Sequence, residues 1–151
     1  MIRDDIKAAL VTAMKARDAG KTSALRLIQA AIKNRDIEMR TAARPTEDDL
    51  LVTEVLQKMA KQRRESIEMF EAGGRTELAA GERAELAVVD SFMPAQMDET
   101  AAKAAIGSIV AELGASSVKD MGRVMAAVKE RHSGAIDMAR ASGLVKAALT
   151  A

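Results

Sequence analysis

Apolar residues recur at every third or fourth position along almost the whole chain, and this spacing constrains the fold more than any other feature. Side chains three or four residues apart share one face of an α-helix, whereas a half-buried strand alternates every second residue. The residues that fill the pattern are rich in Ala, Leu, Met, Glu, Lys and Arg, which lose little side-chain freedom in a helix. The only aromatic residues are Phe70 and Phe92. We therefore predict an all-α fold.

Glycine, proline and capping residues divide this pattern into seven expected helices. Their approximate ranges are 3–18, 22–41, 47–72, 76–92, 98–113, 117–132 and 137–149. The expected terminators are Gly20, Pro45, Gly73-Gly74, Pro94, Gly114 and Ser133-Gly134. The expected N-terminal caps are a capping box of Thr46 with Asp49, then Asp98, then Ser116 or Ser117, and finally Asp137.

Pro94 is the strongest candidate for a domain boundary, because it stands between two periodic segments and is one of only two prolines. We predict an N-terminal helical subdomain of about four helices over residues 1–94 and a C-terminal three-helix bundle over residues 95–151. The expected core of the bundle consists of Ile106, Ile109, Val118, Met121, Met125, Val128, Leu144 and Leu149.

Composition excludes several kinds of catalytic site. The chain has no Cys and one His, His132, so thiolate catalysis, disulfides and multi-histidine zinc sites are ruled out. No phosphate-binding glycine loop is present. We expect Ser116-Ser117 and His132 to have roles at helix ends, and the acidic pairs Asp48-Asp49 and Glu82/Glu85 to be ordinary helix-surface partners. The sequence therefore predicts no catalytic residue, no cofactor and no metal.

The first five residues are already charged, and no long apolar run follows them. We therefore expect no signal peptide, no membrane partner and a cytoplasmic location.

Basic residues are concentrated near the C-terminus. From Ala115 onward there are six Lys or Arg against three acidic residues, although the net charge of the chain is only +1. The candidate nucleic-acid-binding residues are Lys119, Arg123, Lys129, Arg131 and Lys146. Lys119 and Arg123 are four apart and are expected to share a helix face. A second basic run, at 61–64, is followed by three glutamates, so we expect a solvated face there.

The scarcity of aromatic residues restricts the kind of nucleic acid that the chain can bind. Readers of single-stranded RNA stack bases on aromatic side chains, which are nearly absent here. Any RNA partner is therefore expected to be folded and bound by its shape and phosphates, and no DNA partner is expected.

Four stretches occur in the order of a known family. They are MKARD at 14–18 with LRLI at 25–28, KQRRESI at 61–67 with GGR at 73–75, EL at 85–86 with FMPAQM at 92–97, and GAS at 114–116 with KDMGRVM at 119–125. Together they resemble the GatB/YqeY family, specifically its stand-alone YqeY-like members. The chain differs from the family pattern near the C-terminus. The pattern has a polar residue such as Asn before a Leu-Val-Lys run, whereas here Leu144-Val145-Lys146 follow Ser142-Gly143.

The resemblance implies a helical fold of two subdomains. It also implies a relationship to the tail of the GatB subunit of tRNA-dependent amidotransferase, which helps to hold the outer corner of tRNA while other domains carry the chemistry. The leading hypothesis is thus a module without its own active site that docks on tRNA or on a tRNA-handling complex. Two alternatives stay open, a contributor to glutamine-dependent carbon–nitrogen ligase activity and a protein-binding helical adaptor.

Overall fold

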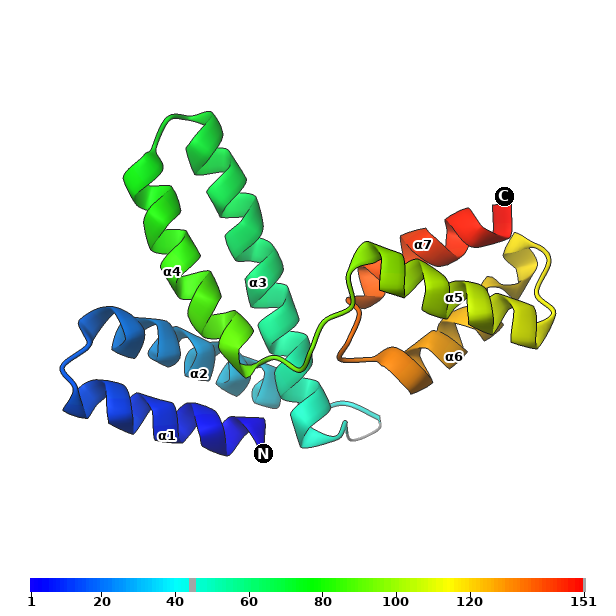
Figure 1. The fold of residues 1–151 in the computed structure, drawn as a ribbon. Helices are drawn as coiled ribbons and strands as arrows, with labels where there is room; N and C mark the ends of the chain where they lie inside the picture. The colour runs from blue at the N-terminus through cyan, green and yellow to red at the C-terminus, as the bar shows by residue number, and fades with distance from the viewer. Residues whose placement is uncertain (44–45, 151) are drawn as a thin grey trace. The chain divides into compact units, whose positions relative to one another are not determined.

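A computed structural model describes residues 1–43 and 46–150, in which short connections join a series of helices (Figure 1). The described part of the chain contains seven α-helices and one 3-10 helix, and no β-strand occurs in it. The elements are α1 (Ile2–Lys15), α2 (Ala19–Met39), α3 (Asp48–Ala72), α4 (Thr76–Phe92), α5 (Glu99–Leu113), η1 (Val118–Asp120), α6 (Met121–His132) and α7 (Met138–Thr150). The predicted all-α fold is confirmed. The terminator expected at Pro45 lies outside the described residues.

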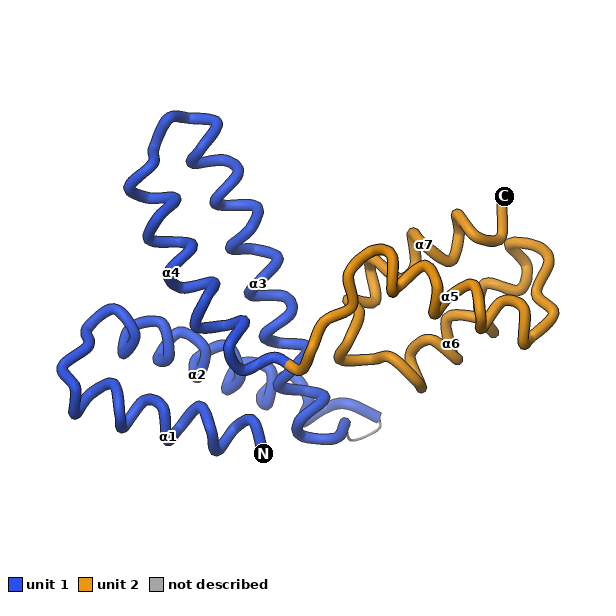
Figure 2. The backbone as a smooth tube through the Cα atoms, viewed as in Figure 1, with its two compact units in different colours: residues 1–93 blue, residues 94–151 orange. Residues whose placement is uncertain are grey.

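The chain forms two compact units, residues 1–93 and 94–151, each with its own core (Figure 2). In the N-terminal unit α1 and α2 form one antiparallel hairpin, and α3 and α4 form a longer one (Figure 1). Almost no surface of Ile6, Leu25, Ile28, Val52 or Leu56 is exposed. Full burial of one such side chain contributes about 1.5–3 kcal/mol, so this aliphatic cluster is the main stabilising element of the unit.

The turn between α1 and α2 differs from the prediction that Gly20 ends the first helix. Helix α1 ends at Lys15, and Gly20 lies in the first turn of α2. The chain reverses at Arg17, the only non-glycine residue with positive φ (55°) among those described. Asp18 then caps α2, because its Oδ1 accepts a hydrogen bond from the backbone N–H of Lys21 at 3.0 Å.

The capping box predicted for Thr46 and Asp49 is wrong, because Glu47 occupies the N-cap position of α3 and makes no side-chain cap. The Asp49 carboxylate is used in a tertiary contact instead. Its Oδ1 accepts a hydrogen bond from the backbone N–H of Ile2 at 3.0 Å, so α3 caps the start of α1. A contact across 47 residues of sequence has replaced the local one.

Arg3 joins three helices through one guanidinium group. It lies 2.8 Å from Asp36 of α2 and 2.7 Å from Asp48 of α3, with further hydrogen bonds to both carboxylates. The hydrogen bond from Arg3 holds the pKa of Asp36 below its ordinary range, and the two carboxylates raise the pKa of Arg3. The network fixes how α1, α2 and α3 meet at this end of the unit.

The α3–α4 hairpin is held together beyond the main core by ion pairs. Arg63 lies 3.1 Å from Glu82 and 3.0 Å from Glu85, and its side chain is only 23% exposed. The solvated face expected for residues 61–64 is therefore wrong at Arg63, because the glutamates that pair with it come from α4 and not from its own helix. Two further pairs across the hairpin are Arg64 with Asp90 and Arg83 with Glu71. Gly73-Gly74 end α3 as predicted, with Gly74 at φ 72°.

The C-terminal unit packs α5, α6 and α7 around a second aliphatic core. Both ends of α5 are capped as predicted. Asp98 accepts a hydrogen bond from the Ala101 N–H at 2.7 Å, and Gly114 ends the helix with a left-handed φ of 61°. Of the predicted core, Ile106, Ile109, Val128 and Leu149 are buried, while Met121, Met125 and Leu144 are half-buried.

Val118 is exposed, and its predicted burial is wrong. It belongs to the 3-10 helix η1 and not to α6, so extending the helical spacing back to it gives the wrong face. Val124 and Val145, which the prediction missed, are fully buried in its place.

The Arg3 network gives a stability prediction. We expect Arg3→Met to lower the free energy of unfolding by about 1–2 kcal/mol, because both partly exposed carboxylates lose a bidentate partner. The ionised form of Asp36, whose pKa is lowered, stabilises the fold above the ordinary carboxyl range, and this contribution disappears as the pH falls through the lowered pKa. Urea unfolding should show this loss of unfolding free energy in full at neutral pH and a smaller loss in acid. Lys58→Met, at an exposed position of α3, is the control, and a pH-independent deficit would contradict the account.

The helix register of the C-terminal unit is tested by a pair of valines. Val124→Ala should destabilise by about 2 kcal/mol, since it empties a fully buried site. Val118→Ala should change stability by less than about 0.5 kcal/mol, since the side chain is exposed. Thermal unfolding of both variants decides between the two registers, and equal destabilisation would mean that Val118 is buried after all.

Candidate nucleic-acid interface

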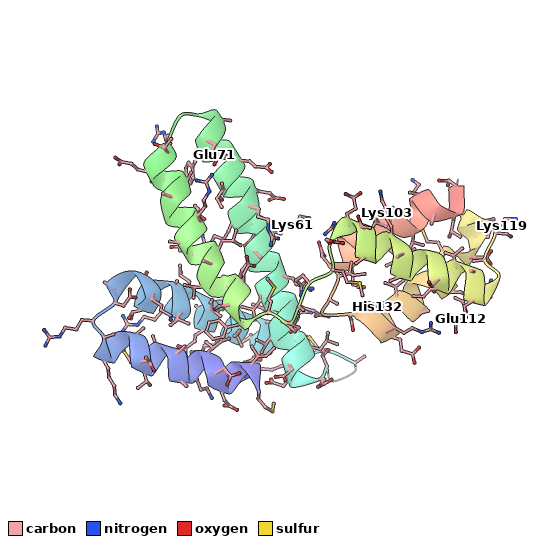
Figure 3. All side chains as sticks on the ribbon, viewed as in Figure 1. Lys61, Glu71, Lys103, Glu112, Lys119 and His132 are labelled. Carbon is pink, nitrogen blue, oxygen red and sulfur yellow. The ribbon has the colours of Figure 1, made fainter. Side chains whose placement is uncertain are left out.

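All five candidate basic residues belong to the C-terminal unit and are exposed. Lys119 lies in η1, Lys146 lies in α7, and Arg123, Lys129 and Arg131 lie in α6. Figure 3 shows Lys119 close to the connection that follows α5, whereas His132 lies at the other end of α6. The candidates are therefore distributed over three elements of one bundle.

The segment that carries Lys119 is held by the Asp120 carboxylate. Its Oδ2 accepts hydrogen bonds from the backbone N–H groups of Ser116 at 3.0 Å and Ser117 at 3.3 Å. These bonds, the one from Ser116 first, together with Arg123, lower the pKa of Asp120. Ser117 is the residue before η1, as the capping prediction required. Lys119 itself is in η1, so the prediction that it shares one α-helical face with Arg123 is wrong.

The two arginines among the candidates are paired within the unit. Nη2 of Arg123 lies 2.9 Å from Asp120, and its Nη1 donates to the Leu113 carbonyl at 3.4 Å. Arg131 forms a bidentate pair with Glu112 of α5, at 2.6 and 3.1 Å. This contact lowers the pKa of Glu112 and raises that of Arg131. Part of the basic excess is thus neutralised by acidic partners.

The three lysines have a different environment. No carboxylate of the described residues lies within ion-pair distance of Lys119, Lys129 or Lys146. Arg140 of α7, which sequence reasoning counted but did not select, is exposed and equally without an ion pair among the described residues. These four cations provide positive charge that a phosphate-bearing partner can bind without displacing an acidic group.

The match to known proteins covers both units. Residues 3–149 match the family described as Yqey-like protein. The chain belongs to the YqeY family. Curated relatives of this YqeY-family chain include two fungal proteins, each named "Altered inheritance of mitochondria protein 41, mitochondrial". The one from Eremothecium gossypii is 34% identical over 103 residues, which is 66% of this chain and 55% of the relative. The one from Saccharomyces cerevisiae (strain ATCC 204508 / S288c) is 32% identical over 93 residues, or 62% and 46% respectively. The chain spans about half the length of these relatives.

The remaining candidate groups of this YqeY-family chain have structural partners. Asp48, Asp49, Glu82 and Glu85 are occupied by the arginine pairs and the helix cap described above. The carbonyl of His132 accepts hydrogen bonds from the N–H groups of two residues just after α6, at 2.9 and 3.2 Å. Among residues 1–43 and 46–150, no cluster of three potential metal ligands occurs, and no helix is both long and apolar enough to cross a membrane.

Proposed function

We propose that this YqeY-family chain is a binding module for folded RNA of the tRNA type, and that its C-terminal unit makes the contact. The observation that carries the proposal is the set of exposed cations on η1, α6 and α7 that have no ion-pair partner among residues 1–43 and 46–150. Such cations attract phosphates through release of condensed counterions. The role is to position RNA, or a complex that handles RNA, and not to perform chemistry on it.

The chemistry of the C-terminal unit favours phosphate recognition over base recognition. Residues 94–151 contain no Phe, Tyr or Trp, so this unit lacks the row of aromatic side chains on which single-strand binders stack successive bases. Lysine interacts with phosphate as a flexible point charge and needs no fixed geometry. Contact by lysines alone therefore suits a partner that is recognised by the course of its backbone.

The exposed arginines supply a second, weaker contribution. Arg123 and Arg131 are 57% and 43% exposed, and solvent screens their pairs with Asp120 and Glu112. Guanidinium groups bind phosphate bidentately, so both can exchange a carboxylate for a phosphate at little cost.

We propose that the protein acts in the cytoplasm. The curated relatives are named as mitochondrial, so cell fractionation is a direct test that distinguishes the two compartments.

The RNA proposal predicts the effect of removing three charges. Changing Lys119, Lys129 and Lys146 together to Gln should weaken binding to several tRNAs alike and flatten the salt dependence by about three contacts' worth. The measurement is a titration with tRNA at two salt concentrations. The matched control changes Lys7, Lys58 and Lys61, exposed lysines of the N-terminal unit, to Gln. Equal binding by the two triple variants, or no binding by the wild type at low salt, would refute the proposal.

A separate prediction is that the protein alone does not hydrolyse glutamine. The purified protein should release no ammonia from glutamine above a protein-free blank, because the sequence contains no cysteine and no recognisable nucleophile with its base. An ammonia assay with a known glutaminase as positive control is sufficient. Release that scales with protein concentration and persists through repeated purification would instead favour the ligase-contributor alternative.

A further inference from the structure

A groove follows the α1–α2 hairpin of the N-terminal unit. A hollow of about 510 Å³ lies at the turn end of the hairpin, and a smaller one of about 140 Å³ lies toward its open end. The first is lined by Met14, Arg17, Ala19, Thr22, Ser23, Arg26 and Leu27. The second is lined by Arg3, Ile6, Lys7, Gln29, Ile32, Lys33 and Asp36.

The two hollows border the same helix faces. On α2 the lining residues Thr22, Arg26, Gln29 and Lys33 follow one another at steps of three or four, and so form one continuous stripe. On α1 the lining residues Lys7 and Met14 are seven apart and likewise share a face. We call the combined surface the α1–α2 groove. Its two hollows lie toward opposite ends of α1, which at 14 residues is about 20 Å long.

The groove is positively charged. Among the described residues, no carboxylate lies within ion-pair distance of Arg17, Arg26 or Lys33, and the closest to Lys7 is the exposed Asp4 at 3.9 Å. The two acids nearby have other partners. Asp36 is bound by Arg3, and Asp18 caps the start of α2. The cations of the groove are therefore available to an external acidic group.

The groove also exposes large apolar side chains beside its cations. This distinguishes it from the positions of the three lysines in the C-terminal unit that lack an ion pair among the described residues. Met14 and Leu27 line its larger hollow and are each 44% exposed, and Val11 on the same helix as Met14 is 45% exposed. Leaving large aliphatic side chains in water forgoes stabilisation that burial against a partner would provide. Phosphate backbones offer no surface to bury them, whereas a leucine-bearing protein segment does.

We propose that the α1–α2 groove binds an acidic amphipathic helix of a partner protein. Apolar side chains at helical spacing pack on Met14 and Leu27, while flanking carboxylates pair with Arg17, Arg26 and Lys33 on the rim. This is the helix-in-groove mode of recognition, read through anchors three, four and seven residues apart. The length of α1 suits a partner helix of about 14 residues. The inference goes beyond the RNA proposal and does not rest on it, because it concerns the other unit.

The test uses the full chain and a synthetic probe. The probe is a fluorescein-labelled helical peptide of about 16 residues, with leucines on one face and glutamates beside them. A control peptide has the same composition with the leucines and glutamates shuffled, so that it lacks an apolar face. Fluorescence anisotropy should show micromolar binding of the first peptide and binding about tenfold weaker for the second. No binding of the amphipathic peptide, or equal binding of both, would overturn the proposal.

Matched variants locate the binding. We expect two variants to lower the affinity for the amphipathic peptide about tenfold each. One is Leu27→Ser, and the other is the double change Arg26→Glu with Lys33→Glu. The control is Lys58→Glu with Lys61→Glu, which makes the same change in charge on the exposed face of α3 and should leave affinity unchanged. All five positions are exposed, and circular dichroism tests that the fold is kept. If the control weakens the peptide as much as the groove variants do, or if Leu27→Ser abolishes tRNA binding instead, the groove is not a site for a protein helix.

Discussion

Both units depend on buried cores in which every fully buried apolar side chain is aliphatic. The spacing between packed helices is set by the side chains at their contacts, and small residues allow the closest approach. Six alanines are buried here, and they are Ala13, Ala24, Ala60, Ala79, Ala102 and Ala141. Ile, Leu and Val fill the remaining core volume. The fold thereby reaches close packing with short side chains and needs no large ring at the centre of either unit.

Non-directional packing of this kind does not select which helices meet, and the contacts of two half-buried arginines supply that selection. Arg3 bridges α1 to α2 and α3, and Arg63 bridges α3 to α4 through two glutamates. Both guanidinium groups are at most 26% exposed, so their charges are screened less than those of surface pairs. Because leaving either group without its partners costs more than the pair contributes, misaligned arrangements of the hairpins are disfavoured.

Local rules predicted those parts of the fold that local chemistry determines. Asp98, Gly74 and Gly114 do what residues of their type do at helix ends, and the spacing of Ile106, Ile109 and Val128 predicted their burial correctly. Predictions failed where a distant partner competes with a local one. Asp49 caps the first helix in place of its own, since Ile2 reaches it from across the unit.

Partners from distant helices also determine which parts of the candidate sites could not be predicted from the sequence. A count of basic residues located the charged bundle but not the pairing of Arg131, whose partner Glu112 comes from another helix. The α1–α2 groove was not predicted at all. Met14 is 44% exposed in the larger hollow, and nothing in the local sequence distinguishes it from a buried methionine. That exposed apolar and basic side chains of α1 and α2 line the same hollow is visible only in three dimensions.

The far end of the α3–α4 hairpin has a consequence for how the molecule opens. Ile67 and Ala79 are the buried apolar residues there, and neither belongs to the main core. Met69 and Leu78 are 75% and 47% exposed, so charge pairs, which salt weakens, contribute a large share of the cohesion. This segment therefore behaves as its own unit of local opening. A rise in ionic strength weakens these pairs, so we expect the tip of the hairpin to open before the aliphatic core at its base.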